Sequence, residues 1–481
     1  MTGAISPDDF YPLLQILTTE LSFILNIDPH VLMKILPPVF SLIYIFGVFC
    51  FVRWIFDDRR VLLLVLSVIT LPILQFEHLF FRPYNAGYFL LPLVLFLYFR
   101  LLFGWKHPSA GHVAFLLATL PVVFYHPLIA LILIGILLLW RVTAIFVRLK
   151  QRDRQSHFVS RGRSILVIEL IIVLTFSWYT MYRVVVLSGA SIFIGRGSSE
   201  YEQISEVAER TSPSILDLLQ RGFAAYGLEM IIIAVTSVMV VYLGYNSYKR
   251  NNSIKGFIFF LCAIFMASTF LSFLSIFIDI VFEPERFLMY AIFSGVIVTS
   301  VGFSTLLQNS SKVMFRTIWS TFCSYLFILA VMSTILIYPS PITDTANYQV
   351  TEHETEGMNW VLNNHNPKID IQEHGIEQNR FADLLGDTES DFFAPSENRY
   401  PPDHFGYDNT STVGAGYEED TYIVITKLGR LENPVLYPDY PEFWRHTPAD
   451  FEQLEVDNTA NAIYSNGEFD MYLINSRNED L

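Results

Sequence analysis

The chain has 481 residues, of which 52% are hydrophobic and 16% are charged. Soluble domains carry about 25% charged residues, so this composition excludes a single soluble enzyme and indicates an integral membrane protein. The net charge is −15 and is unevenly distributed. Residues 339–481 contain 28 acidic and 7 basic side chains, whereas the preceding residues contain 18 acidic and 24 basic ones. A segment this acidic repels phosphates, so we expect no nucleic-acid partner.

The first 30 residues predict an external segment. Residues 11–27 (YPLLQILTTELSFILNI) are apolar on one side and too short to span a bilayer, which is typical of a helix that lies in the membrane interface. Asp8 and Asp9 precede this helix. Two adjacent carboxylates can hold a divalent metal or act as a base. Alternatively, they form a solvated turn that caps the helix.

A transmembrane domain is predicted over residues 31–338, where apolar runs have about the length that crosses a bilayer. Two of these runs are separated only by Tyr125-His126-Pro127, so they form either a tight hairpin or a re-entrant pair. We expect about ten transmembrane helices, at 31–52, 61–76, 86–104, 110–125, 127–147, 164–182, 228–247, 256–280, 287–307 and 315–337.

The loops between these runs differ in their content of Lys and Arg. Loops on one side hold 17 basic residues, seven of them between Arg141 and Arg163, and the opposite loops hold seven. Cytoplasmic loops carry the excess of Lys and Arg, so we expect both the amino terminus and the segment 339–481 outside the cell. No signal peptide is visible, and an upstream transmembrane helix missing from this chain would explain an external amino terminus.

The acidic segment 339–481 has the pattern of a folded domain. Residues 352–364 predict a helix, and TYIVITKL at 421–428 predicts a strand. Residues 461–474 (NAIYSNGEFDMYLI) form two alternating runs around Asn466-Gly467, which favours a β-hairpin. We therefore expect a mainly α membrane protein with a small external α/β or α+β domain at its C-terminus. The three cysteines all lie in apolar runs, so no disulfide framework is expected.

Ionisable residues near the outer ends of spans are candidates for function, because charge at membrane depth is costly. The loop QFEHLFFRPYN contains Glu77, His78 and Arg82. A carboxylate beside an imidazole can bind a metal or move a proton, and an arginine can clamp a phosphate through two parallel hydrogen bonds. In the alternative, aromatic residues anchor this loop in the interface while Arg82 snorkels.

Two further outer positions stand out. His126 lies in the YHP turn, where a lone histidine is either a satisfied structural residue or a substrate ligand. Arg286 lies in FEPERF and opens the ninth apolar run. Its guanidinium matches the oxygens of a lipid phosphate, or it pairs with a neighbouring Glu at the membrane surface. The sequence contains no Gly-rich phosphate loop and no His-Glu-x-x-His motif, so ATP-driven transport by this chain alone is not expected.

The order of these features resembles that of a known superfamily. An acidic segment, the amphipathic YPLLQILTTELSFILNI, many spans, Glu77-His78, the YHP turn and the ERF arginine follow one another. EGMNWVLNNHNP, NRFADLLG and NAIYSNGEFDMYLI complete the C-terminal part. The chain is similar to the GT-C superfamily of multispanning glycosyltransferases, especially archaeal oligosaccharyltransferase-like and mannosyltransferase-like proteins. The resemblance covers most of the chain through short, diffuse motifs.

The resemblance implies that a sugar leaves a polyprenyl-phosphate carrier at the external membrane face. It implies an acidic residue in the first external loop as base or metal ligand, a second acidic site in the next loop, and a basic residue on the lipid phosphate. One departure is that the family's first span should precede Tyr11, where only ten residues remain. Carried over to this sequence, Asp8 or Asp9 is the first-loop acid, Glu77 with His78 is the second site, and Arg286 holds the phosphate. Together with the candidates from the residues themselves, the expected catalytic residues are Asp8, Asp9, Glu77 and His78, and the expected substrate-binding residues are Arg82, His126 and Arg286. The expected ligands of a Mg²⁺ or Mn²⁺ ion are Asp9, Glu77 and His78.

These observations predict a multi-pass protein of the cell membrane that transfers a sugar from a polyprenyl-phosphate-linked donor to a lipid-linked or protein-bound glycan. Its partners would be lipid-linked saccharides and other glycan-assembly proteins. The first alternative is a non-catalytic transporter or scaffold for lipid-linked saccharides. The second is an envelope-anchored binding protein whose domain 339–481 carries the function.

Overall fold

The computed structural model describes most of the chain, and the two compact units into which the chain divides are taken in turn. Unit 1 comprises Met1–Ser205 and Tyr226–Tyr338, and unit 2 comprises Glu206–Ala225 and Pro339–Leu481. Asp8 and Asp9 lie outside the described residues. The described residues are 12–79, 82–104, 108–151, 163–179, 215–249, 255–277, 284–340, 346–375, 381, 399–438, 440–441 and 444–476.

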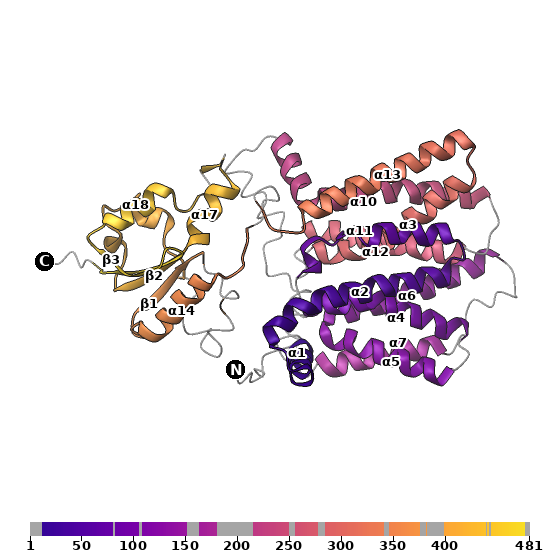
Figure 1. Ribbon diagram of the computed structural model, residues 1–481, viewed down its shortest axis with the longest axis horizontal. Coiled ribbons are helices and arrows are strands. Elements are labelled where there is room, and N and C mark those ends of the chain that lie inside the picture. The colour runs from indigo at the N-terminus through magenta and orange to yellow at the C-terminus, as the bar shows by residue number, and fades with distance from the viewer. Residues whose placement is uncertain are drawn as a thin grey trace. The chain divides into compact units, whose positions relative to one another are not determined.

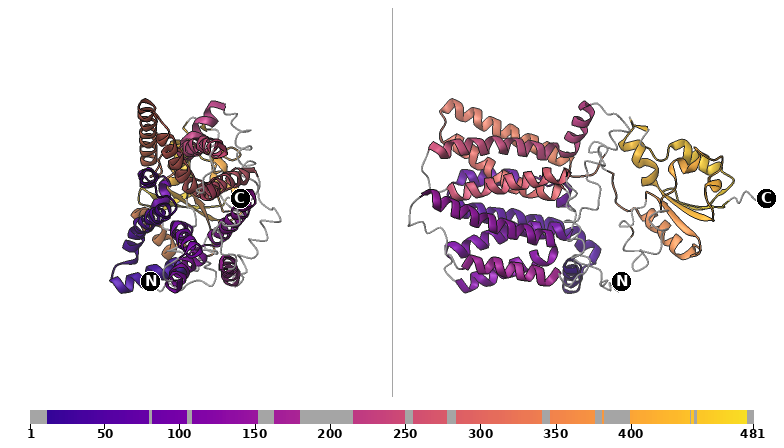
Figure 2. Two further views of the ribbon diagram at one scale, coloured as in Figure 1. Left: turned by 90° about the vertical axis from the view of Figure 1, so that its right-hand side faces the viewer. Right: turned by 180° about the vertical axis from the view of Figure 1, so that it is seen from behind.

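Unit 1 is a bundle of helices that run alongside one another (Figures 1 and 2). Among the described residues, seven helices are long and apolar enough to cross a membrane, namely α2, α4, α6, α10, α11, α12 and α13. A polytopic helical membrane protein is thereby confirmed. The helices are α1 (Pro12–Leu25), α2 (Pro29–Ile55), α3 (Arg59–Ile69), α4 (Pro83–Phe103), α5 (Pro108–Tyr125), α6 (Pro127–Gln151), α7 (Arg163–Tyr179), α10 (Ile215–Lys249), α11 (Lys255–Phe277), α12 (Pro284–Gln308) and α13 (Lys312–Ile335), with the 3₁₀ turn η1 (Gln75–His78) after α3.

Three of the ten predicted spans are not among these seven helices. The run 61–76 forms α3, which has only 11 residues and is therefore about 16 Å long, half of a bilayer core. It ends at Ile69 because Pro72 disfavours a helical conformation at the residue before it. The runs 110–125 and 164–182 form α5 with 18 residues and α7 with 17 residues.

Small residues allow the spans of unit 1 to pack closely around α12, which is almost entirely buried. A Cβ atom added to Gly302 of α12 would lie 2.6 Å from the sulfur of Met239 on α10, and one added to Gly295 would lie 2.9 Å from Oγ1 of Thr236. Glycine at such positions lets two helix backbones approach each other. At these two positions, side chains of α10 therefore pack directly against the backbone of α12.

Unit 2 contains a mixed sheet of four strands in the order β1-β2-β4-β3. β1 is parallel to β2, whereas β4 is antiparallel to both β2 and β3. This arrangement confirms the expected small domain of helices and strands at the C-terminus. The elements are α14 (Glu352–Asn364), β1 (Asp370–His374), η5 (Asp403–Gly406), η6 (Val413–Gly416), β2 (Thr421–Thr426), α17 (Lys427–Leu436), α18 (Pro448–Val456), β3 (Ala460–Ser465) and β4 (Phe469–Ile474).

Strand β2 is the centre of unit 2, because all its residues are buried. Alternate side chains point to opposite faces of a sheet. On one face, Tyr422 and Val424 belong to the same apolar cluster as Met358 of α14. On the other face, Ile423 and Ile425 share a cluster with Phe451 of α18. The sheet is therefore covered by helices on both faces, with α14 and α18 on opposite sides of it in Figure 1.

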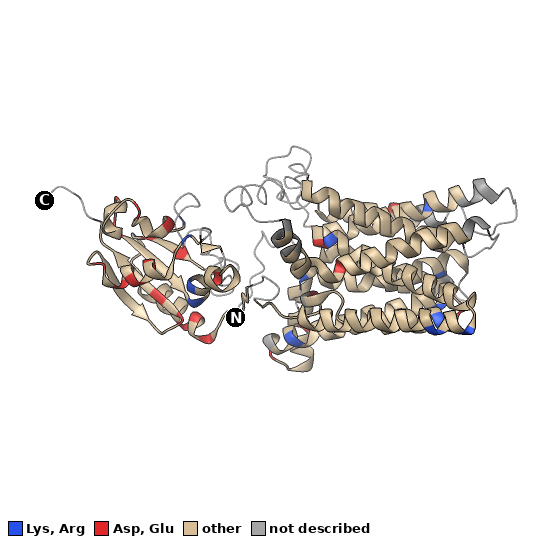
Figure 3. Ribbon diagram, turned by 90° about the horizontal axis from the view of Figure 1, so that it is seen from above, with Lys and Arg blue, Asp and Glu red and all other residues tan. Residues whose placement is uncertain are grey.

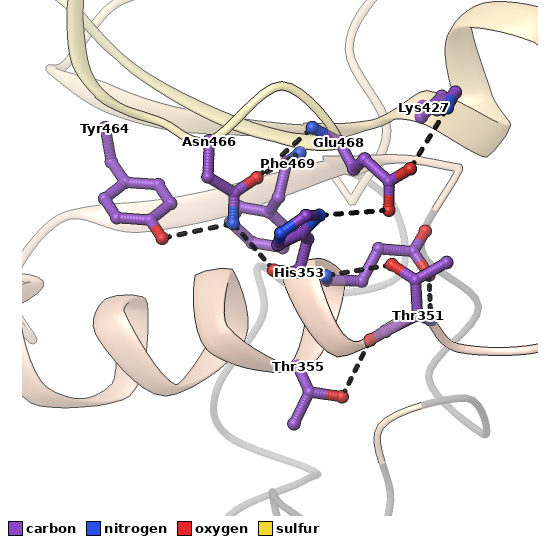
Figure 4. A network of polar contacts seen from close by, with 9 residues as sticks. Thr351, His353, Thr355, Lys427, Tyr464, Asn466, Glu468 and Phe469 are labelled. Carbon is purple, nitrogen blue, oxygen red and sulfur yellow. Dashed lines mark hydrogen bonds and ion pairs between the residues drawn. The ribbon is translucent and has the colours of Figure 1, made fainter.

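The hairpin predicted around Asn466-Gly467 is confirmed, and Figure 4 shows the contacts of its turn. Gly467 has φ +87°, a conformation that glycine adopts without steric cost. The side-chain oxygen of Asn466 accepts hydrogen bonds from the backbone of Glu468 (3.2 Å) and of Phe469 (3.0 Å). Its amide donates to the carbonyl of His353 in the first turn of α14 (2.8 Å). The turn is thereby fixed to the helix that covers the sheet.

Candidate functional site

The two ends of the unit 1 bundle carry different residues. α12 has 25 residues, so its ends lie about 37 Å apart at 1.5 Å per residue. At its last residue, Gln308 donates to Asp58, which precedes Arg59 and Arg60 of α3 (2.6 Å). In its first turn, Arg286 contacts Tyr84 at the start of α4. We call these the Asp58 end and the Arg286 end. Figure 3, in which Lys and Arg positions are coloured blue, shows several of those of the bundle gathered at one end.

Glu77 belongs to the Arg286 end, where it is fixed by the first turn of α4. The side-chain amide of Asn85 donates a hydrogen bond to Oε2 of Glu77 and contacts its backbone carbonyl at 3.4 Å. Asn85 is almost fully buried (1% exposed). Because a buried donor holds one carboxylate oxygen, the Glu77 carboxylate has a defined orientation.

His78 is held on two sides. Its Nδ1 shares a hydrogen bond with Oγ of Ser41 on α2 (3.0 Å), and its ring stacks on Phe89 of α4 with centroids 5.6 Å apart. Burial lowers the pKa of His78 to about 4, so the ring is neutral at neutral pH. Its Nε2 is buried and has no hydrogen-bond partner among the described residues. His78 can therefore exchange a hydrogen bond or a proton, but it does not supply a permanent positive charge.

Arg286 supplies a half-buried cation at this end. The central carbon of its guanidinium lies 5.3 Å from the centroid of the Tyr84 ring, in the geometry of a cation–π contact. The hydroxyl of Tyr84 donates to the backbone carbonyl of Arg286 (2.8 Å), which fixes α4 to α12. The neighbouring Glu285 accepts a hydrogen bond from the hydroxyl of Tyr226 (2.8 Å). Arg286 is thus half-buried at a helix N-terminus, where backbone N–H groups also favour anions.

His126 lies beside the same tyrosine. Its ring meets the ring of Tyr84 edge-on, with centroids 5.5 Å apart. Its Nδ1 accepts a hydrogen bond from the backbone N–H of Leu128 at the start of α6 (3.2 Å). Burial, and then the nearby charge of Arg286, lower the pKa of His126 to about 3. His126 is therefore a neutral residue that caps α6, and the structure places it next to Arg286.

The remaining candidates differ in how well the structure places them. Arg82 is exposed at the residue before α4. Asp8 and Asp9 lie outside the described residues. The predicted Mg²⁺ or Mn²⁺ site needs Asp9, and no three His, Cys, Asp or Glu side chains of the described ranges come together as metal ligands. Glu77 and His78 alone do not make a divalent-cation site, because they offer one carboxylate and one imidazole nitrogen and Asn85 already engages the carboxylate.

Several residues of the Arg286 end were not identified from the sequence. Ser41, Tyr84 and Asn85 hold the candidate side chains, and Glu229 of α10 accepts a hydrogen bond from Gln75 (2.5 Å). For Glu229 the sequence does contain a signal, since it is the only charged residue of the run AYGLEMIII. A lone acid in such a run is a candidate for function. The positions of the other three residues depend on how the helices pack.

Comparisons with solved structures concern the fold of the chain. The arabinofuranosyltransferase AftD from Mycobacteria is 12% identical, with a TM-score of 0.53, over 99% of this chain and 36% of that chain. An Archaeoglobus fulgidus oligosaccharyltransferase tethered with an acceptor peptide is 11% identical, with a TM-score of 0.49, over 97% and 66%. ArnT from Cupriavidus metallidurans bound to undecaprenyl phosphate is 11% identical, with a TM-score of 0.43, over 96% and 87%.

At identities of 11% and 12%, these likenesses concern the fold and not the reaction. The chain spans 66% of the oligosaccharyltransferase and 36% of AftD, so most of AftD has no counterpart here. At 12% identity the similarity to AftD supports a common fold, which agrees with the GT-C fold expected above, and does not transfer a reaction. No curated protein matches the chain. The model of the family of unknown function DUF6541 matches residues 31–375, which is more than half of the chain, and the protein belongs to that family.

Proposed function

We propose that the protein transfers a sugar from a polyprenyl-phosphate-linked donor to a lipid-linked or protein-bound glycan at the external membrane face. The observation that carries the proposal is Arg286, a half-buried guanidinium on the face of Tyr84 at the start of α12. A guanidinium matches two phosphate oxygens, and the helix N-terminus adds favourable N–H groups. The likeness of fold to AftD is an analogy and supports the same class of enzyme.

The reaction gives each side chain a distinct role. The bond between the anomeric carbon and the phosphate oxygen breaks, and the polyprenyl phosphate leaves with the electron pair. Arg286 binds this phosphate and stabilises its developing charge. The acceptor hydroxyl forms the new bond to the anomeric carbon and gives its proton to a carboxylate base. Glu77 is the described residue proposed as that base, because its carboxylate lies at the Arg286 end in an orientation that Asn85 fixes.

His78 and His126 are proposed as neutral partners of the substrate. Their pKa values of about 4 and about 3 keep both rings uncharged at neutral pH, so neither competes with Arg286 for the phosphate. Arg82 is proposed as a second contact to the lipid phosphate, because it is exposed at the residue before α4 and a guanidinium can bind phosphate oxygens. Asp8 and Asp9 remain candidates for the first-loop acid, and no step is assigned to a metal ion.

We also propose a topology for this function. The external segment comprises residues 1–30, the transmembrane domain residues 31–338, and the external domain residues 339–481. The charge of the last segment, with 28 acidic and 7 basic residues, and the 17-to-7 distribution of basic residues between the loops support this assignment. The Arg286 end then faces outward, together with the lipid-linked saccharide and its acceptor.

The experiment is a transfer assay in membranes that contain the full-length protein. It measures release of sugar from a labelled polyprenyl-phosphate donor. For Arg286→Lys, loss of a bidentate charged contact typically costs about 2–5 kcal/mol, which corresponds to a reduction in kcat/KM of about thirtyfold or more. The matched control is Arg100→Lys in the last turn of α4, which lies away from the Arg286 end and should keep wild-type turnover.

Each outcome discriminates between functions. Equal turnover of the Arg286→Lys and Arg100→Lys proteins would remove Arg286 from the site. Binding of polyprenyl phosphate by the wild-type protein without any sugar transfer would replace the enzyme with the scaffold for lipid-linked saccharides. Activity that is lost in Glu77→Gln as well as in Arg286→Lys supports the proposed division of roles.

A further inference from the structure

The segment Gln75–His78, which carries the proposed base, is held by three different helices. Gln75 donates through Nε2 to Oε1 of Glu229 on α10 (2.5 Å). Glu77 is held by α4 and His78 by α2, through the hydrogen bonds described above. Since one anchor comes from each helix, loss of the α10 anchor leaves the start of the segment without its side-chain support. The Gln75–Glu229 contact thus holds the start of the segment that contains Glu77 and His78.

The backbone at Gln75 needs such support. Gln75 has φ +53°, in the left-handed region that residues other than glycine rarely adopt. Its backbone N–H donates to the carbonyl of Pro72 (2.9 Å), and that of Glu77 donates to the carbonyl of Leu74 (3.0 Å), so the chain turns sharply here. Strained backbone persists where surrounding contacts over-determine it, and such positions cluster at functional sites. The Gln75–Glu229 hydrogen bond is one of these contacts.

Glu229 is also costly as a purely structural residue. It lies in an apolar run of α10, and its second carboxyl oxygen, Oε2, is buried without a hydrogen-bond partner among the described residues. A buried polar atom without a partner costs free energy, and an acid within a span is a candidate for function by default. An apolar residue would pack here without this cost, so the carboxyl group points to a role beyond packing.

We propose that Glu229 is a positioning residue, which acts through Gln75 to hold Glu77 and His78 in the orientation that the reaction requires. The inference rests on the proposed function, and it adds a residue on α10 that lies 154 positions from its partner in the sequence. Glu229 has no direct contact with the donor in this scheme. Its removal should therefore lower kcat while leaving the KM for the donor unchanged.

The first test is a double-mutant cycle in the transfer assay. We expect Glu229→Leu and Gln75→Leu each to lower kcat about tenfold, and the double variant to lose no more than either single one, because both remove the same contact. Glu229→Gln keeps an oxygen acceptor for Gln75 and should restore most of the activity. The control Glu169→Gln changes an exposed acid of α7 and should have no effect. Additive losses, or a Glu229→Gln protein as inactive as Glu229→Leu, would overturn the proposal.

The second test does not depend on catalysis. A cysteine at Leu79, which is 39% exposed directly after His78, is labelled with a maleimide in a protein whose three native cysteines are replaced. We expect Glu229→Leu to change the labelling rate and Glu169→Gln to leave it unchanged. An unchanged rate in Glu229→Leu would refute the anchoring role, whatever the protein catalyses. A changed rate in a protein that transfers no sugar would support the anchor and reject the proposed function.

Discussion

Loss of Arg399 should destabilise unit 2 strongly. Nε of Arg399 lies 2.6 Å from Oε1 of Glu373 on β1, and the two side chains are 14% and 1% exposed. The backbone N–H of Glu373 also donates to the carbonyl of Arg399 (2.9 Å). In Arg399→Met the carboxylate stays buried without its counter-charge. Breaking a buried pair in this way costs about 3–5 kcal/mol, which lowers the midpoint of thermal unfolding by roughly 10–20 °C.

The assay uses the full-length protein in detergent. Samples are heated, exposed briefly to a protease, and analysed for an intact C-terminal tag, which reports on unit 2. The control is Lys427→Met, which breaks an exposed pair with Glu468 (3.0 Å) and should cost at most about 1 kcal/mol. The double variant Glu373→Met/Arg399→Met should recover most of the loss, because no buried charge remains. If Arg399→Met unfolded at the same temperature as Lys427→Met, the reasoning about this buried pair would be wrong.

Three further predictions concern unit 2. Gly357→Ala should destabilise unit 2 by about 1–3 kcal/mol despite the helix preference of Ala, because the new Cβ would lie 2.3 Å from Cγ of Phe469. The control Gly416→Ala has open space around the new Cβ and should be neutral in the same assay. Acid should lower the stability of unit 2 as the pH falls from about 6.5 toward 4, because burial lowers the pKa of His374 to about 3 and of His446 to about 4, so the unfolded state binds more protons. His404 opposes this trend, because its hydrogen bond to Asp450 raises its pKa. If the stability of His446→Phe had the same pH slope as that of the wild-type protein, the assignment to His446 would be contradicted. Protease added to intact cells should cleave unit 2 and spare the basic segment 141–163, and protection of unit 2 would reverse the proposed topology.

Much of the fold follows from short stretches of sequence. Apolar runs longer than a bilayer core become helices, because a backbone in lipid must satisfy its hydrogen bonds internally. The helix at 352–364 begins where Thr351 and Glu354 form a capping box, and the hairpin turns at Asn466-Gly467 because glycine accepts a positive φ. Even the early end of α3 has a local cause in Pro72, which the apolar character of the run does not reveal.

The candidate site was predictable only in part. Glu77, His78, His126 and Arg286 were identifiable as ionisable residues near span ends, and the contact of Glu77 with Asn85 joins positions only eight apart. The contact of Arg286 with Tyr84 joins positions 202 apart. Which two helix ends meet depends on side-chain packing along the whole bundle, for example on Gly302 against Met239. Hydrophobic periodicity does not contain that information.

The sequence by itself therefore determined the membrane-spanning character, the acidic C-terminal domain with its hairpin, and a set of polar residues near span ends. The tertiary structure decided which of those residues meet, and it added Ser41, Tyr84 and Asn85 as their partners and Glu229 as the partner of Gln75. The physical reason is the range of the interactions. Helix formation, capping and turns depend on neighbours within a few residues, whereas the candidate site is assembled by the packing of α2, α4, α10 and α12, which come from separate parts of the chain.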